Sequence, residues 1–425
     1  MKVTLALLTT LLVASSATAT PIKQDIISKP TGFDINAINK QKVVSYGPRP
    51  YYLVEDLKAG PLKDKLAACG EKKAKPSKWV IGHRGGGTLQ FPEHSLQSNL
   101  AGARMGAGVL ECDVAFTKDL KLVCRHSHCD LHTTTNILTI PELAAKCTTP
   151  FQPANGTAPA KANCCTSDIT LAEYKTLCAK MDSFNASATT PEAYQGGVPS
   201  WRTTLYNQCG TLLTLAEHIQ VVEKLGLEHS PELKTPSVKM PFNGWTQEDY
   251  AQAFVDEFKK AGVKFNKVWA QSFLYSDILY WLKKEPAFGK QALFLDSVAD
   301  TAGMDAAVAN LTRYKADGVR LVSPPINYLL VQAEGNTTIV PSAYAKKANE
   351  LGLGIITWSL ERSPPPEIAH GTKDSYYSTF SNWISRDADI LTVLDVLANQ
   401  VKVKKIFADW TATAAFFGDC FGIKG

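Results

Sequence analysis

The sequence has no long hydrophobic run beyond its first residues and no concentrated excess of charge of one sign. No later segment reaches ~18 uninterrupted apolar residues, the length that a membrane-spanning helix needs. The formal net charge is +5 over 425 residues, and no dense stripe of lysine and arginine is interleaved with aromatic residues. The Gly-x-Ser-x-Gly elbow of serine hydrolases is also absent. We therefore expect no transmembrane segment and no nucleic-acid partner, and no obligate protein partner is evident.

The first residues, MKVTLALLTTLLVASSATAT, have the pattern of a secretory signal. They combine a basic start, a short apolar run and a stretch of small residues at Ala17–Ala19. We predict a signal peptide at residues 1–19 and a soluble protein secreted to the cell exterior or the cell wall. Sequons that weakly support a glycoprotein occur at Asn155, Asn185, Asn310 and Asn336.

Ten cysteines agree with an oxidising compartment. Six of them fall in one segment: Cys129, Cys147, Cys164, Cys165, Cys178 and Cys209. We expect disulfides there, although spacing alone leaves their connectivity open. Cys69 and Cys420 are candidates to join the two ends of the chain.

Short apolar runs recur from Val80 onward, and most are followed by a helix-like stretch. The runs are VIGHR, GVLECD, GLEHSPELK, KVWAQSF, QALFLD, GVRLVSP, GIITWSL and ADILTV. Such alternation predicts an α/β fold with a parallel sheet, and eight units favour a closed (β/α)8 TIM-type barrel over an open doubly wound sheet. Helices are predicted between the runs, at Ser95–Met105, Thr246–Lys260, Pro341–Leu351 and Ser375–Ile384.

These runs suggest how the chain is divided. After the signal peptide, we expect an N-terminal extension at residues 20–78 and the barrel at residues 79–425. A Cys-, Thr- and Pro-rich excursion at residues 127–212 separates the second and third predicted strands. Structureless loops of that length are uncommon, so we expect this segment to be a disulfide-stapled cap beside the site.

Polar residues gather where the predicted strands end, which is where TIM barrels carry their reactive groups. They are His83, Arg84, Glu111, Asp113, Glu232, Lys234, Gln271 and Trp358. The three glycines after Arg84 would let the backbone approach an anion closely. The same stretch lacks the Gly-Lys-Ser/Thr ending of a P-loop, which argues against nucleotide binding.

Three acidic residues form a candidate metal site. Glu111 and Asp113 are two residues apart on one strand and share a face, and Glu232 ends another strand. Carboxylates that are so close repel each other unless a cation lies between them or one is protonated. Oxygen ligands without a thiolate suit a hard divalent ion, Mg²⁺ or Ca²⁺.

Two histidines can reach the same mouth. The segment after Asp113 is too short for a parallel crossover, so Val123–His126 must return as an antiparallel hairpin. A two-residue turn at Lys118–Asp119 would place His126 opposite Glu111. With His83 at the end of the first strand, the two imidazoles could divide the roles of general acid and general base.

Other residues fit an anionic substrate. Arg84 and Lys234 could bind an anionic oxygen. Trp358 and Phe273 could line the substrate pocket. Core packing explains Phe273 equally well, whereas the position of Trp358 at a strand end favours a functional role. A rival zinc site in HSHCDLH rests on weak His-x-His spacing, and its Cys129 begins the disulfide-rich segment.

The motifs HRG, PEHS, ECDVAFTKD, PELK and AQSF, in this order between about Val80 and Leu394, resemble the glycerophosphodiester phosphodiesterase family, and the layout resembles its secreted fungal members. The resemblance implies metal-dependent hydrolysis of a small phosphodiester to glycerol 3-phosphate and a free alcohol. His83 and His126 would be the catalytic pair. The remaining roles implied are metal ligation by Glu111, Asp113 and Glu232 and substrate binding by Arg84, Glu93 and Lys234. Gln271 and Trp358, which end predicted strands, are further candidates for substrate binding.

This sequence departs from the family pattern in three places. His94 and Ser95 replace the Asn-Thr of the usual Pro-Glu-Asn-Thr, and Ser127 replaces the aspartate of the usual His-Asp. The predicted eighth strand, in ADILTVLD, lacks the family's Thr-Asp finish.

Two alternative functions remain open. One is phospholipase D-like action on lysophospholipids or sphingolipids. The other is a non-catalytic secreted binding protein on the same scaffold, against which the intact acidic and histidine residues argue.

Overall fold

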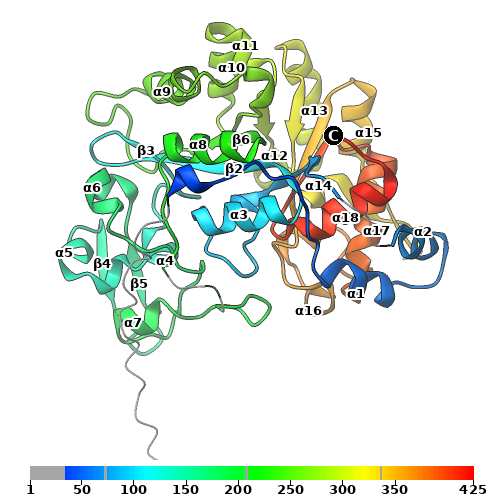
Figure 1. Ribbon diagram of the computed structural model, residues 1–425, viewed down its shortest axis with the longest axis horizontal. Coiled ribbons are helices and arrows are strands. Elements are labelled where there is room, and N and C mark those ends of the chain that lie inside the picture. Colours follow the sequence, from blue (N-terminus) through cyan, green and yellow to red (C-terminus); the bar gives the residue numbers. More distant parts are fainter. Residues whose placement is uncertain (1–33, 71–73, 205, 207–208, 336) are drawn as a thin grey trace, which may run out of the picture.

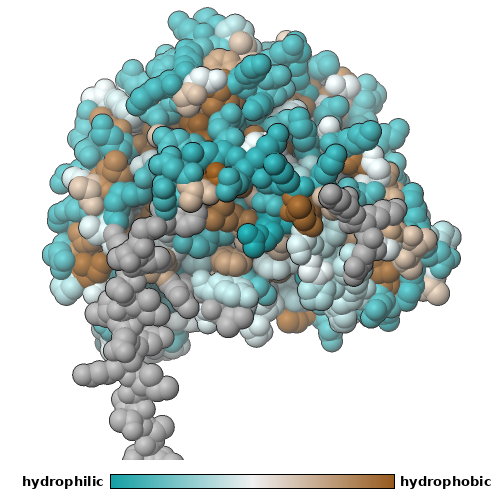
Figure 2. All heavy atoms as spheres, viewed as in Figure 1, coloured by the Kyte–Doolittle hydropathy of each residue, from teal (hydrophilic) through white to brown (hydrophobic). Residues whose placement is uncertain are grey.

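The computed structural model describes residues 34–70, 74–204, 206, 209–335 and 337–425. The predicted signal peptide and the sequon at Asn336 lie outside the described residues. Among the residues described, no helix combines the length and apolar character needed to cross a bilayer. Hydrophilic residues cover most of the face shown in Figure 2, where hydrophobic residues occur only in small groups.

Eight parallel strands close into a barrel, which confirms the predicted fold (Figure 1). In spatial order they are β1 (Ser77–Gly82), β2 (Ala107–Phe116), β6 (Glu228–Leu233), β7 (Gln271–Ser272), β8 (Leu293–Leu295), β9 (Leu321–Ser323), β12 (Gly354–Leu360) and β13 (Lys405–Ala408). The pairing of β13 with β1 closes the ring. β1 begins two residues before the expected domain boundary at residue 79.

Helices cover the outside of this barrel. The longer ones are α3 (Leu96–Arg104), α8 (Leu215–Leu225), α9 (Gln247–Lys260), α10 (Tyr275–Lys284), α13 (Met304–Ala316), α15 (Ala343–Glu350), α17 (Asp389–Asp395) and α18 (Thr411–Phe421). Shorter elements are α11 (Pro286–Gly289), α12 (Val298–Ala302), α14 (Ile326–Leu329), α16 (Pro366–Ala369) and the ribbon of β10 (Leu330–Gln332) and β11 (Ile339–Pro341). Several helices begin at a serine or threonine whose hydroxyl accepts a backbone N–H of the first turn, as at Ser95, Thr214 and Thr246.

The eighth strand is not where the sequence pattern placed it. The run ADILTV forms α17, which continues into a π-helical turn at Val396–Val401. Its apolar residues extend over a length typical of a buried helix rather than of a strand. The strand is instead β13, whose short sequence KIFA follows several lysines.

A second prediction was also wrong. The segment Ser375–Ile384 forms only a 3-10 turn at Ser375–Tyr377 rather than a helix. The hydroxyl of Thr379 there donates to the backbone carbonyls of Asn327 and Leu330. Such bonds from a side chain to the backbone compete with helical hydrogen bonds.

The hairpin after β2 is present, but its register differs by one residue from the expected one. β3 (Leu122–Cys124) pairs antiparallel with β2, and Ala115 faces Val123. The loop has three residues rather than two, because Leu120 adopts a left-handed conformation (φ 60°) and the Thr117 N–H bonds the Lys121 carbonyl. This slip leaves His126 beyond the end of the ladder.

The excursion between β3 and α8 has a hydrophobic cluster of its own, which includes Leu131, Ile169, Tyr174 and Tyr194. Its elements, which lie to one side of the barrel in Figure 1, are α4 (Leu131–Thr134), α5 (Pro141–Ala144), β4 (Thr149–Gln152), β5 (Lys161–Asn163), α6 (Leu171–Tyr174) and α7 (Pro191–Tyr194). We call this segment the cap. Its six cysteines pair as Cys129–Cys165, Cys147–Cys164 and Cys178–Cys209.

The remaining four cysteines form two disulfides outside the cap. Cys112 of β2 is bonded to Cys124 of β3. Cys69 is bonded to Cys420, as anticipated, and so ties the N-terminal helices α1 (Arg49–Asp56) and α2 (Pro61–Cys69) to α18. The ten cysteines thus form five disulfides.

We expect the Cys69–Cys420 bond to stabilise the fold more than a short cap disulfide does. It closes 351 residues, whereas Cys147–Cys164 closes 17. The chain-entropy relation gives about 6 kcal/mol for the long loop and about 3 kcal/mol for the short one. Cys69→Ser/Cys420→Ser should therefore lower Tm in non-reducing thermal unfolding more than Cys147→Ser/Cys164→Ser does. Equal losses would contradict this order.

Candidate active site at the carboxyl end of the barrel

The three predicted acidic residues meet at the carboxyl end of β2 and β6. The β2–β6 register sets Asp113 directly opposite Glu232, and Glu111 lies two residues before Asp113 on the same face. One carboxylate oxygen from each residue lies within 4.8 Å of the other two. All three side chains are buried.

The electrostatics of this cluster show an excess of negative charge. Burial and the charge of Asp113 raise the pKa of Glu111 well above its usual value. Burial likewise raises the pKa of Glu232 to about 8, despite the opposing charge of Lys234. For Asp113, burial is outweighed by Lys234 and His94, which hold its pKa well below the usual range.

These residues fit a hard divalent cation. The Asp113 Oδ1 atom is buried and accepts no hydrogen bond from any described residue. A cation would satisfy that oxygen and relieve the repulsion among the carboxylates. The ligand set consists of oxygen atoms alone, which suits Mg²⁺ or Ca²⁺.

His83 lies beside this cluster and is held from behind by Asp409. Its Nδ1 is 2.6 Å from Asp409 Oδ1 and 2.9 Å from the Ser359 hydroxyl, which itself donates to Asp409 at 2.8 Å. Its Nε2 lies 3.9 Å from Glu111 Oε2. Burial lowers the pKa of His83, although Asp409 opposes this.

Asp409 was missed at the sequence level because the eighth strand was misplaced. It directly follows β13, so the strand does end in the acidic residue of the family's Thr-Asp finish, with Ala408 before it. Burial would raise its pKa, but His83 and Arg362 hold it well below its usual value. The signal that could have revealed it is the acidic residue after the short apolar run KIFA.

His126 also reaches the mouth, in spite of the register error. Its ring lies with the carboxylates of Glu93 and Asp130, with ligand atoms within 4.8 Å of one another. Burial and the Arg84 guanidinium lower the pKa of His126 well below its usual value, which favours the neutral imidazole. Burial raises the pKa of Asp130 to about 7. Asp130 is therefore an acidic neighbour of His126 in this protein, in which Ser127 replaces the family's aspartate.

Two guanidinium groups lie next to these carboxylates. Arg84 donates from Nη1 to Glu93 Oε2 at 2.7 Å, and Arg362 Nη1 lies 3.3 Å from the same oxygen. Arg362 also donates to Asp182 at 2.9 Å and lies 3.3 Å from Asp409. Sequence reasoning missed Arg362, which follows β12, and Asp182, which the cap supplies.

The other predicted residues occupy the same mouth. Lys234 forms an ion pair with Glu232 at 2.7 Å, and Gln271 donates to Glu111 at 2.9 Å. The backbone N–H of Arg84 donates to Glu111 at 2.6 Å. His94, the residue that departs from the family pattern, contacts Asp113 through Nε2 at 2.9 Å.

Trp358 is partly buried at the end of β12. Its indole N–H donates to the Ser323 carbonyl at 2.8 Å. Its ring meets Phe273 and Tyr376 edge to face, with centroids 5.9 Å and 5.8 Å away. The two predicted aromatic residues, Trp358 and Phe273, are therefore in contact with each other.

The alternative zinc site is not formed. Cys129 is consumed by its disulfide with Cys165. His132 Nδ1 accepts the backbone N–H of Cys164, and the His128 ring packs edge-on against Phe116 at 4.6 Å. The described residues therefore do not bring these side chains together around one point.

Comparisons with known proteins find relatives of this chain. An extracellular protein of Arthroderma benhamiae is 44% identical over 246 residues, which are 57% of this chain and 100% of that protein. A proposed glycerophosphoryl diester phosphodiesterase of Silicibacter pomeroyi is 16% identical, with a TM-score of 0.53 over 85% of this chain and 98% of that one. An Oleispira antarctica phosphodiesterase, solved with the product sn-glycerol-3-phosphate, is 15% identical with a TM-score of 0.45 over 80% of this chain and 96% of that one.

The likeness to the S. pomeroyi structure shows the fold alone. The family itself is shown by sequence, because a model described as the glycerophosphoryl diester phosphodiesterase family matches residues 83–378, more than half of the chain. The protein belongs to the glycerophosphoryl diester phosphodiesterase family.

Proposed function

We propose that this phosphodiesterase hydrolyses small glycerophosphodiesters to glycerol 3-phosphate and a free alcohol, with a divalent cation and with His83 and His126 as general acid and base. The observation that carries the proposal is the cluster of Glu111, Asp113 and Glu232 at the barrel mouth. His83 lies 3.9 Å from Glu111, and His126 is near enough for its charge to lower the pKa of Asp113. The extracellular relative from A. benhamiae supports a secreted enzyme.

Arg84, Arg362 and Lys234 supply the positive charge that a phosphodiester needs. The planar guanidinium group pairs with phosphate oxygens through two parallel N–H donors, and lysine adds a compact point charge. Ion pairs with Glu93 and Asp182 orient the two arginines. Side chains that the protein itself orients cost less to order on substrate binding.

Glu111, Asp113 and Glu232 would hold the cation, Mg²⁺ or Ca²⁺. When bound, it supplies Lewis-acid neutralisation of the phosphodiester oxygens. Lys234 and His94, which contact these ligands, orient Glu232 and Asp113 respectively. Such supporting contacts fix the direction in which a ligand atom points.

The histidines move protons. One takes the proton of the nucleophile, and the other gives a proton to the departing alkoxide. Asp409 accepts from the Nδ1–H of His83, which leaves Nε2 directed toward the site and stabilises the ring when it is charged. The nucleophile is water or a hydroxyl of the substrate's own glycerol, and a trapped cyclic phosphate would identify the second case.

A lysophospholipid is the second candidate substrate. Phe91, next to the PEHS motif, stacks on Tyr206 of the cap with centroids 4.8 Å apart, and Tyr206 is 48% exposed. An aromatic pair of this kind can contact an acyl chain. Parallel assays with glycerophosphocholine and with a lysophospholipid, each measuring the alcohol released, distinguish the two candidate substrates.

Chelation should abolish the release of glycerol 3-phosphate. Removing the cation leaves three buried carboxylates that repel the phosphodiester. A coupled assay with EDTA, followed by addition of excess Mg²⁺ or Ca²⁺, measures loss and recovery. Undiminished turnover in EDTA after exhaustive dialysis would show that no exchangeable cation is required.

Asp409→Asn should reduce kcat by roughly 10²- to 10⁴-fold, the range of a general acid–base contribution, because the amide cannot stabilise charged His83. Asp296→Asn is the matched control, since Asp296 follows β8 and accepts from Tyr344 rather than from a histidine. Steady-state kinetics over pH 5–9 measure both variants. A comparable loss in both would attribute the effect to folding.

Asp182→Ala should raise KM roughly 10-fold, because it removes the charged hydrogen bond that orients Arg362. The exposed Glu192→Ala in the same cap serves as control. Kinetics with one soluble diester are sufficient. If kcat fell while KM stayed constant, Asp182 would act on chemistry rather than on phosphate binding.

A further inference from the structure

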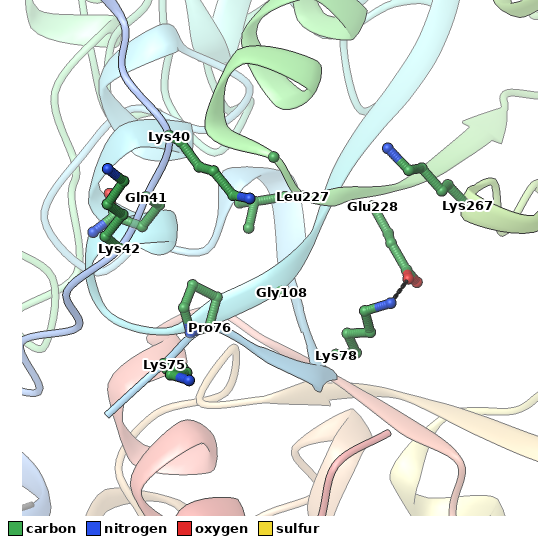
Figure 3. A pocket seen from close by; sticks show the side chains of 11 residues that line it. Lys40, Gln41, Lys42, Lys75, Pro76, Lys78, Gly108, Leu227, Glu228 and Lys267 are labelled. Carbon is green, nitrogen blue, oxygen red and sulfur yellow. Dashed lines mark ion pairs between the residues drawn. The ribbon is translucent and has the colours of Figure 1, made fainter. Parts of the chain in front are cut away.

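The amino-terminal end of the barrel, opposite the active-site mouth, contains a cavity of about 440 Å³ (Figure 3). It opens where the strands begin, between Pro76 and Lys78 at β1, Gly108 in β2, and Leu227 and Glu228 at β6. This volume lies within the range of about 300–1,000 Å³ that is typical of small-molecule sites. We call it the basal cavity.

Lysines dominate the lining of the basal cavity. They come from separate segments of the chain that surround it in Figure 3: Lys40, Lys42, Lys75, Lys78 and Lys267. Gly226, at φ 73°, leaves room for Lys40, because a Cβ there would come within 3.1 Å of the lysine stem. Among the described residues that line the cavity, Glu228 is the only one with a carboxylate.

Glu228 does not neutralise this positive charge. Its Oε1 forms an ion pair with Lys78 at 2.6 Å, and its Oε2 accepts the indole N–H of Trp269 at 2.9 Å. The buried Lys405 lies 3.9 Å from Oε2 as well. One carboxylate is thus shared between two lysines.

The other cavity lysines have little or no compensation. Lys40, Lys42 and Lys75 form no ion pair with any residue that the structure describes. Lys267 lies 3.4 Å from Glu223, which also pairs with His229. Lys40, Lys42 and Lys75 are exposed, so solvent screens their mutual repulsion, but together they give the hollow a positive potential that attracts anions.

The basal cavity is separate from the active site. The barrel interior between them is filled by an apolar layer: Ile81, Val109, Leu293, Leu321, Ile356 and Phe407. Along β6, the four steps from Glu228 to Glu232 span ~13 Å at the usual rise per residue of a strand. An anion held at one end therefore does not contact groups at the other.

We propose that the basal cavity is a second anion site, which binds a small polyanion carrying two or more phosphate groups. Lysine recognises charge through a flexible stem rather than geometry through a planar fork. Several such point charges around a hollow of this size favour a compact ion of high charge over a single carboxylate or monophosphate. No step of the hydrolysis at the mouth requires this site.

Isothermal titration of the full chain with tripolyphosphate, in phosphate-free buffer with EDTA and 0.15 M NaCl, tests the proposal. The variant Lys40→Gln/Lys42→Gln/Lys75→Gln should weaken binding at least 10-fold and leave turnover of the diester unchanged. Lys283→Gln/Lys284→Gln/Lys290→Gln removes the same charge from exposed lysines elsewhere and should change binding less than 2-fold. Equal losses of tripolyphosphate affinity in both variants would show that binding depends only on net charge, and would overturn the proposal.

Chemical acetylation of lysines, read by mass spectrometry, locates the ligand. Tripolyphosphate should protect Lys40, Lys42 and Lys75, while sulfate at matched ionic strength should protect them weakly. Protection of Lys234 alone would place the anion at the active site and refute a basal site. Equal protection by sulfate, or none by either anion, would also refute it.

Discussion

The parallel pairing of β13 with β1 is the contact on which the active-site end of this protein depends. It sets Gly82 opposite Ala408, so the next residue on each strand, His83 and Asp409, meets the other. These two side chains are 326 residues apart in sequence and 2.6 Å apart in space. Closure of the barrel therefore both completes the backbone hydrogen bonds and positions an imidazole.

The barrel mouth that results contains buried side chains of both charges, paired with one another. Arg362 contacts carboxylates from three segments, namely Glu93, the cap residue Asp182 and Asp409. In surroundings from which water is excluded, loss of one partner leaves another charge uncompensated, which costs several kcal/mol. The cap is thus tied to the chemistry of the barrel by an ion pair as well as by packing.

The two ends of the same strands carry opposite charge. β6 begins with Glu228 beside the lysine-lined basal cavity, and Glu232, one residue before its end, belongs to the carboxylate cluster. The apolar layer between them, which includes Val109 and Phe407, separates the two environments. In this fold the carboxyl end is the usual place for catalysis, and the amino-terminal end is free to take on another role.

Local sequence pattern was sufficient to predict the barrel and the faces on which Glu111 and Asp113 lie, because the two-residue period of a strand fixes which side chains share a side. It was not sufficient for the hairpin register, which depends on the left-handed conformation of Leu120. Nor did it locate β13, because the longer apolar run in α17 gives a stronger local signal than KIFA does.

The sequence by itself determined that residues such as His83 and Glu232 stand near strand ends, and which chemistry those residue types can support. Tertiary structure alone decided the partners: Asp409 behind His83, Asp182 on Arg362, and the pairing of the cap cysteines. The physical reason is that periodicity reports only neighbours along the chain. Contacts between distant segments depend on how the barrel closes and on where the cap packs against it.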